Sequence, residues 1–243
     1  NAVDIQNWSK MIDIRNAVKA FKGIIAIQNL NLQVGKGEIL GLLGANGAGK
    51  STTINLLLGF LSTDAGTVLI DQIDTSKNAQ KVRKMIGYIP ENVNLYPYLS
   101  GVENLDYFCC LAGLSYSKSD LKDFLITCGL PIEAHRQKVF AYSKGMRQKV
   151  GIAIAHAKKA KVYLLDEPAS GLDPLASNEL TVLLKKLAAE GATILMASHD
   201  IFRVREACHR IGILKKGTMV KELRSEDVSA HELEQLYLQY MTN

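Results

Sequence analysis

Short apolar runs separated by polar segments recur along the chain. The runs at 38–43, 162–165 and 192–197 contain few polar residues, which is typical of strands buried on both faces of a parallel sheet. Helical patterns are predicted at 52–58 and 175–189. Strands that alternate with helices in this way predict an α/β core.

A second group of segments alternates apolar and polar residues. Leu30, Leu32 and Val34 alternate with Asn31 and Gln33, as expected of a strand with one exposed face. Similar strands are predicted at 12–14 and 66–71. Because these segments flank the first strand and helix of the core, we expect them to form a small antiparallel layer.

Between residues 91 and 155 the strand-like runs become rare. The patterns at 102–108 and 121–126 are helical, so we expect a helical lobe inserted into the core. The tail from Ser229 to Met241 also has helical spacing and is expected to pack on the body. We therefore predict one domain over 11–224, with core segments 11–90 and 156–224, the lobe at 91–155, and a helical tail at 225–243.

Composition narrows the function only slightly. The chain has 243 residues, is 47% hydrophobic and 22% charged, and carries a formal charge of +5, so it is expected to fold but not, on charge alone, to bind nucleic acid. Such a charge would also suit nucleotide or an anionic membrane face. No apolar run has the length of a membrane-spanning helix, and the four cysteines form no C-x-x-C pair.

The strongest chemical signal is the segment Gly44–Ser51, which fits the P-loop pattern G-x-x-x-x-G-K-[ST]. It lies between a predicted strand and a predicted helix, as the pattern requires. Lys50 is expected to reach the β- and γ-phosphates, and Ser51 to ligate Mg²⁺. The predicted nucleotide-binding residues of this segment are Gly44, Ala45, Asn46, Gly47, Ala48, Gly49, Lys50, Ser51 and Thr52.

Two further segments carry phosphate chemistry. The strand at 162–165 leads into Asp166 and Glu167, a metal-associated acid and a candidate base for the attacking water. Ser143 precedes a basic, apolar-patterned helix start, and helix starts bind anions. A chain with a P-loop does not need a second anion-binding element for one nucleotide, so the surplus element suggests a partner chain.

In this order, the motifs resemble those of an ABC-type ATPase, the nucleotide-binding subunit of an ABC transporter. The resemblance covers about residues 12–222. It implies a P-loop NTPase (RecA-like) α/β core and the cofactors ATP and Mg²⁺. It also implies that Phe21 stacks on adenine, that Glu91 occupies the Q-loop position, and that His199 acts as the switch histidine beside the catalytic residues Lys50 and Glu167.

The same resemblance implies that two copies, or two homologous subunits, dock head to tail around ATP. The signature motif Ser143–Met146 of one copy would contact the nucleotide held by the other. Hydrolysis would open the dimer and drive a transmembrane permease from the cytoplasmic face of the cell membrane, with no nucleic acid involved. The predicted contacts across the dimer are Ser143, Lys144, Gly145, Met146 and Asp173, and the predicted metal-associated residues are Ser51, Asp166 and Glu91.

Two positions depart from the usual family pattern. Glu91 stands where the family has Gln, and Lys144-Gly145-Met146 stands where it has Gly-Gly-Gln. Glu91 adds negative charge near phosphate, and Lys144 is expected to offset part of it. This pairing resembles the ATPase subunits of bacterial ABC-2-type systems, which are mostly exporters.

Two alternatives remain open from the sequence. A soluble ABC ATPase acting on DNA or ribosomes usually carries a long coiled coil or two ATPase units, and this chain shows neither. A small-molecule P-loop kinase would explain Gly44–Ser51 but would leave Ser143, Glu167 and His199 without a role.

Overall fold

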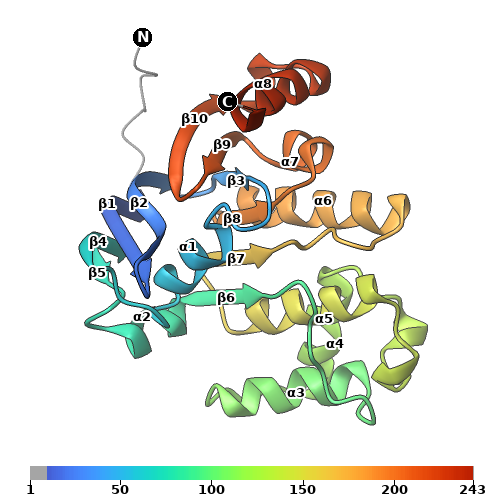
Figure 1. Ribbon diagram of the computed structural model, residues 1–243. Helices are drawn as coiled ribbons and strands as arrows, with labels where there is room; N and C mark the ends of the chain where they lie inside the picture. The colour runs from blue at the N-terminus through green and yellow to red at the C-terminus, as the bar shows by residue number, and fades with distance from the viewer. Residues whose placement is uncertain (1–9, 243) are drawn as a thin grey trace.

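The computed structural model describes residues 10–242, and its centre is a six-stranded sheet in the order β10-β9-β3-β8-β7-β6 (Figure 1). Five strands are parallel, and β10 pairs antiparallel to β9. Every residue of β3 and β8 is buried, as their apolar sequences predict. The strands are β3 (Ile39–Leu43), β6 (Ile86–Ile89), β7 (Val162–Asp166), β8 (Thr193–Ser198), β9 (Arg210–Lys215) and β10 (Thr218–Arg224).

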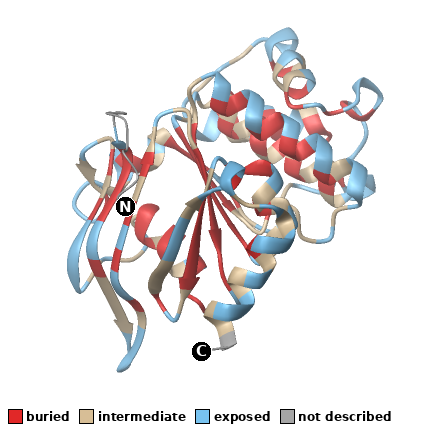
Figure 2. Cartoon of the chain, turned by 90° about the horizontal axis from the view of Figure 1, so that it is seen from above, coloured by how far each residue is buried: buried red, intermediate tan, exposed pale blue. Residues whose placement is uncertain are grey.

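A second, antiparallel sheet has the strand order β2-β1-β4-β5. Ile12 faces Val34 on one neighbour and Ile70 on the other, and all three side chains are buried. This apolar face packs with α1 and the core sheet in one hydrophobic cluster (Figure 2). The strands are β1 (Lys10–Phe21), β2 (Ile24–Gly35), β4 (Ala65–Ile70) and β5 (Ile73–Asp74).

The helices form three groups. α1 and α2 lie near the antiparallel sheet, α3, α4 and α5 form a lobe beyond β6, and α6, α7 and α8 follow the later strands (Figure 1). Ser100 and Ser117 start α3 and α4 with reciprocal capping boxes. The helices are α1 (Lys50–Leu57), α2 (Ala79–Met85), α3 (Gly101–Leu111), α4 (Lys118–Thr127), α5 (Lys144–Ala157), α6 (Pro174–Ala189), α7 (Ile201–Ala207) and α8 (Ala230–Thr242), with short 3₁₀ turns at Ile132–Ala134, Val139–Ala141 and Ser225–Asp227.

The architecture confirms the predicted α/β core with an antiparallel layer and helical lobe. The sequence pattern did not reveal α2, β5, β6 or β10. Helix α5 continues past residue 155 to Ala157 and packs on β6, so the predicted lobe boundary falls inside a helix. The predicted tail helix is α8, which buries Leu233 against the body, while residue 243 of the predicted tail lies outside the described residues.

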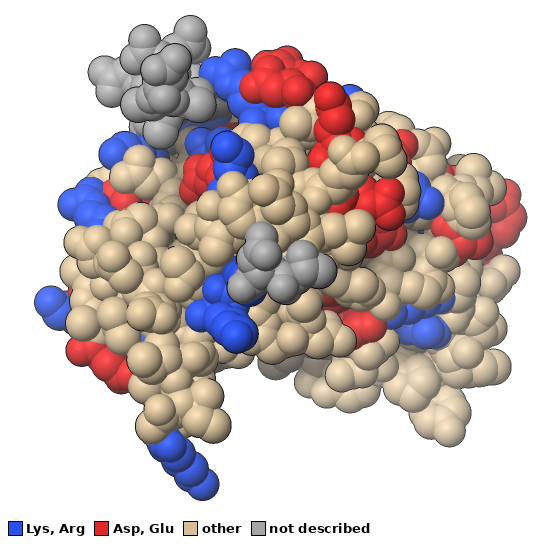
Figure 3. All heavy atoms as spheres, turned by 45° about the horizontal axis from the view of Figure 1, so that its top comes forward, with Lys and Arg blue, Asp and Glu red and all other residues tan. Residues whose placement is uncertain are grey.

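The lengths of the helices and the surface charge both bear on function. Within residues 10–242, every helix is too short or too polar to span a lipid bilayer. On the face in Figure 3, acidic and basic side chains are interspersed on a largely uncharged surface. The modest net charge therefore forms no continuous basic field on that face.

Candidate functional site

The predicted phosphate chemistry gathers at one edge of the core sheet. The P-loop follows β3, and Glu91, Glu167 and His199 follow β6, β7 and β8. These four strands are parallel neighbours, so their carboxyl ends meet at the same edge. A cavity of about 460 Å³ opens there, lined by Phe21, Ala26, Ala45, Asn46, Gly47, Gly49, Lys50, Ser51, Thr52, Glu91, Asp166 and Glu167.

The P-loop geometry depends on glycine. Gly49 has a φ of 110°, and an added Cβ would lie 2.8 Å from the Ala26 oxygen, so a side chain there would be strained and crowded. Gly44 and Ala48 are buried behind the loop and are absent from the cavity lining. The loop therefore presents backbone and the side chains of Lys50 and Ser51 to the cavity.

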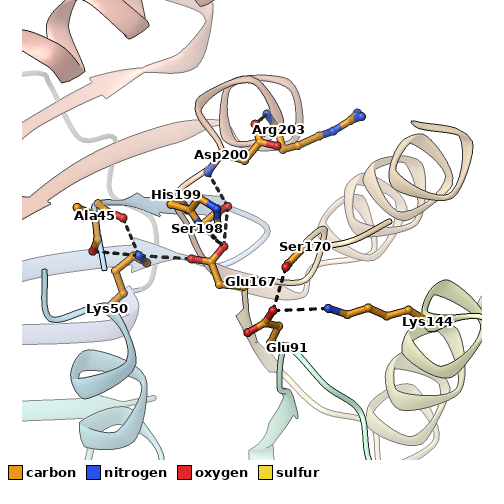
Figure 4. A network of polar contacts seen from close by, with 11 residues as sticks. Ala45, Lys50, Glu91, Lys144, Glu167, Ser170, Ser198, His199, Asp200 and Arg203 are labelled. Carbon is orange, nitrogen blue, oxygen red and sulfur yellow. Dashed lines mark hydrogen bonds and ion pairs between the residues drawn. The ribbon is translucent and has the colours of Figure 1, made fainter. Parts of the chain in front are cut away.

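Lys50 is buried, and its ammonium contacts two carbonyl oxygens of the loop and one carboxylate outside it. Its Nζ donates to the Gly44 oxygen at 2.6 Å and to the Ala45 oxygen at 3.3 Å. It also lies 3.4 Å from Oε1 of Glu167 (Figure 4). The nearest negative charge to this lysine is therefore a carboxylate that lines the same cavity.

Four groups from three residues, Lys50, Ser198 and His199, contact the carboxylate of Glu167. Its backbone φ of 49° is in the left-handed region, which is uncommon for a residue with a side chain. Its Oε2 accepts from the Ser198 hydroxyl at 3.2 Å and the His199 N–H at 3.3 Å, and lies 2.9 Å from His199 Nδ1 (Figure 4). These contacts fix the carboxylate against Lys50 and His199 at the edge of the sheet.

Asp166 lies at the end of β7 beside Ser51. Burial raises the pKa of Asp166, and the hydrogen bond from the Ser51 hydroxyl acts in the opposite direction. Within residues 10–242 no cluster of three or more His, Cys, Asp or Glu side chains is placed to hold a metal. The residues present fit Mg²⁺ that arrives with phosphates, because Ser51 offers a hydroxyl and Asp166 a nearby carboxylate.

Phe21 ends β1 at the mouth of the cavity and is 42% exposed. The Lys19 ammonium lies 5.6 Å from the centre of its ring, a cation–π distance. Aromatic side chains of the core are normally buried. Because the Phe21 ring is exposed at the cavity, a planar ligand can stack on it.

Glu91 links the cavity to the lobe. Its Oε1 accepts from the Ser170 hydroxyl at 2.9 Å and lies 3.6 Å from Nζ of Lys144 (Figure 4). The expected charge compensation between Glu91 and Lys144 is therefore a direct contact within one chain.

The other predicted dimer contacts lie outside the cavity of their own chain. Ser143 is exposed and caps α5, accepting from the Met146 N–H at 3.2 Å. Asp173 is exposed and caps α6, accepting from the Ala176 N–H at 2.8 Å. Gly145 is buried between these helices, where an added Cβ would lie 3.3 Å from the Ala176 Cβ.

Sequence reasoning did not single out Ser170, Ser198 or Gln148. Ser170 and Ser198 contact the carboxylates of Glu91 and Glu167. The available signal for Ser198 was its position directly after the predicted strand at 192–197, and for Ser170 its position three residues after Glu167. Gln148 is 2% exposed, and in the part of the chain that the structure describes its side-chain amide has no hydrogen-bond partner.

The amino-acid sequence matches a known protein family and several known proteins. The family described as ABC transporter matches residues 27–170. The "Uncharacterized ABC transporter ATP-binding protein YhcH" of Bacillus subtilis (strain 168) is 36% identical over 94% of this chain and 75% of its own length. The "Bacitracin transport ATP-binding protein BcrA" of Enterococcus faecalis is 34% identical over 95% and 74%.

A solved structure gives the same result. The ATP-binding cassette MJ0796, described as a dimer in a post-hydrolysis state bound to ADP and Pi, superposes with a TM-score of 0.79 and 30% identity. The match covers 88% of this chain and 99% of that chain. The fold prediction and the resemblance inferred from the motifs are therefore both confirmed.

Proposed function

This chain belongs to the ABC transporter family of ATP-binding proteins and is an ATPase, and we propose that it drives a membrane exporter by closing head to tail on a second ATPase subunit. The observation that carries the proposal is the separation of two phosphate-binding elements. Lys50 lines the cavity, whereas Ser143 is exposed and lies outside it. A second copy would bring Ser143 to the nucleotide that Lys50 holds.

In the proposed mechanism, Lys50 leaves the loop carbonyls and binds the phosphates. The backbone N–H groups of the P-loop, which borders the cavity, hold the remaining oxygens. The adenine ring stacks on Phe21. Ser51, supported by Asp166, would hold Mg²⁺, which would neutralise phosphate charge when bound.

Glu167 is the proposed base. It loses its contact with Lys50 when that lysine binds phosphate, so its carboxylate is freed to orient a water. His199 and Ser198 keep the carboxylate in place through the contacts described above. The left-handed backbone at Glu167 costs about 1 kcal/mol or more, a cost typical of a positioned functional residue.

Ser143 and Gly145 of the second copy would close over the γ-phosphate at the N-terminus of α5. Asp173 and Met146 would lie at the same interface. Cleavage removes the γ-phosphate contact, so the closed dimer is stable with ATP and opens with ADP. The free energy of hydrolysis is thereby delivered as a change of shape.

The permease is proposed to dock on the lobe. Tyr98 and Phe140 are 80% and 67% exposed, and the Phe140 N–H donates to the Pro97 oxygen at 3.0 Å, which brings the two aromatic segments together. The segment from Glu91 to Tyr98 connects this surface to the cavity. The chain would then lie on the cytoplasmic face of the membrane as a peripheral subunit.

The exporter assignment rests on relatives. The bacitracin transport protein supports a role of the ABC-2 type, as do Glu91 and Lys144. The alternative of a soluble ATPase acting on DNA or ribosomes gains no support from these relatives.

Replacing Glu167 by Gln tests the proposed chemistry. The amide keeps the shape of the carboxylate but cannot take a proton, so kcat for MgATP hydrolysis should fall about a hundredfold to ten-thousandfold. ATP binding, measured by equilibrium titration, should persist. Lys50→Ala is the matched control and should lose ATP affinity as well. A Glu167→Gln enzyme that hydrolyses ATP at the parental rate would show that another residue is the base.

A further inference from the structure

One oxygen of Glu91 joins three segments of the chain. Oε1 contacts the Ser170 hydroxyl before α6 and the Lys144 ammonium at the start of α5 (Figure 4). Glu91 itself follows β6 and lines the nucleotide cavity. The lobe, the core and the turn before α6 therefore meet at a single carboxylate.

We propose that Lys144 has two alternating partners, Glu91 of its own chain in the open state and the γ-phosphate held by the second copy in the closed state. The inference rests on the proposed function. While the dimer is open, the Glu91 carboxylate binds Lys144 in place of a phosphate. When ATP is bound, its γ-phosphate competes with Glu91 for Lys144.

The position of Lys144 fits such an exchange. It directly follows Ser143, the residue proposed to reach across the dimer, so its ammonium starts from the same helix end. Its side chain lies along Gly171, where an added Cβ would be 3.8 Å from both Cδ and Nζ of Lys144. The flexible lysine stem thus lies beside the turn before α6.

The energetics also favour an exchange over a permanent pair. The Glu91 side chain is 47% exposed and that of Lys144 is 22% exposed, and exposed pairs of this kind are weak. A γ-phosphate carries more charge and offers more acceptor oxygens than one carboxylate, and charge-assisted hydrogen bonds to it are stronger. Lys144 should therefore leave Glu91 when a phosphate is presented, and return when only ADP remains.

The exchange has a consequence for the cavity. Once Lys144 leaves, Glu91 keeps only its contact with Ser170 among those described above. Its charge is then free to act on the nucleotide site that it lines. Closure of the dimer and activation of Glu91 would be coupled through one lysine.

A double-mutant cycle tests the coupling. In the Glu167→Gln background, the dissociation constant of the dimer in saturating MgATP is measured by sedimentation for the parent, Glu91→Gln, Lys144→Met and the double variant. Glu91→Gln should tighten the dimer about threefold to tenfold at low salt, since two weak pairs no longer hold the lysines back. Lys144→Met should weaken it at least about tenfold.

The decisive comparison is between the effect of Glu91→Gln on the dissociation constant of the dimer when Lys144 is present and its effect when Lys144 is replaced by Met. Removing the charge of Glu91 also reduces its repulsion of the nucleotide, but that effect is the same with or without Lys144. In the Lys144→Met background, Glu91→Gln should therefore tighten the dimer at least about threefold less than it does alone. Lys144→Arg should dimerise like the parent, because the positive charge is kept.

Lys149→Met is the matched control. Lys149 lies on the same helix and pairs with Glu179 at 2.6 Å, and neither residue lines the cavity. Its removal should leave the dissociation constant of the dimer unchanged. Thermal unfolding of each variant checks that it is folded.

The outcomes separate the two proposals. An equal effect of Glu91→Gln in both backgrounds, or a Lys144→Met variant that dimerises like the parent, would overturn the exchange while leaving the dimer mechanism intact. A Glu167→Gln protein that stays monomeric in MgATP would overturn the dimer mechanism and the exchange together.

Discussion

Gln148 is the side chain that fits its surroundings least well. It lies in α5 at 2% exposure, and within residues 10–242 neither its Oε1 nor its Nε2 has a hydrogen-bond partner. A buried amide without partners costs about 1–3 kcal/mol. Neither the catalytic residues nor the proposed dimer contacts explain its presence.

Replacement of Gln148 by Met should therefore stabilise the protein. The thioether has nearly the same shape and no polar group to satisfy, so the free energy of unfolding should rise by about 1 kcal/mol. Urea denaturation measures the change. Gln137→Met, at an exposed position, should have little effect. A loss of stability in Gln148→Met would show that the amide is hydrogen-bonded in the folded protein.

Single residues divide into those that the sequence reveals and those that it does not. Gly44–Ser51 and Glu167 follow local patterns that need no knowledge of the fold. The contact of Ser170 with Glu91 joins residues 79 positions apart. Only the packing of distant segments brings them together, so the sequence identified Glu91 but not its hydrogen bond with Ser170.

At the scale of secondary-structure elements, helix α5 packs directly on strand β6. An added Cβ at Gly87 would overlap the Ala155 side chain, so the glycine lets the helix approach the edge strand of the core sheet. This contact anchors the lobe to the core next to Glu91. The relative position of lobe and cavity depends on it.

Gly87→Ala should destabilise the protein by about 1–3 kcal/mol, because the helix must move away from the strand. Ala155→Gly alone should cost about 1 kcal/mol through weaker helix propensity. The double variant should lose less stability than the two single changes combined. In it, the methyl group added at position 87 faces a glycine at position 155 and no longer overlaps a side chain. Chemical denaturation of the three variants provides the comparison, and strict additivity would contradict the close contact.

The same contact explains why β6 escaped detection. Ile86–Ile89 is short and contains Gly87, which is uncommon in strands. β10 was missed for a different reason, because none of its residues is buried and its pattern carries no clear period. The longer apolar strands and the helix after the P-loop were predicted correctly, since periodicity is strongest in buried elements.

For the molecule as a whole, the sequence motifs predicted the fold but not the order of the strands in the sheet. The order β6-β7-β8-β3 is set by packing between distant segments. It brings Glu91, Glu167, His199 and the P-loop together, and leaves Ser143 exposed outside the cavity. A partner copy is the simplest way to give Ser143 a nucleotide, and the dimeric relative MJ0796 is consistent with it.

The most direct measurement is the molecular mass of Glu167→Gln in saturating MgATP, obtained by small-angle scattering. The proposed mechanism predicts twice the mass of one chain with ATP and a single chain with ADP. Adding Ser143→Arg should return the mass to that of one chain while ATP remains bound, because the arginine blocks only the contact across the dimer. A Glu167→Gln protein that remains a single chain with ATP bound would contradict the mechanism.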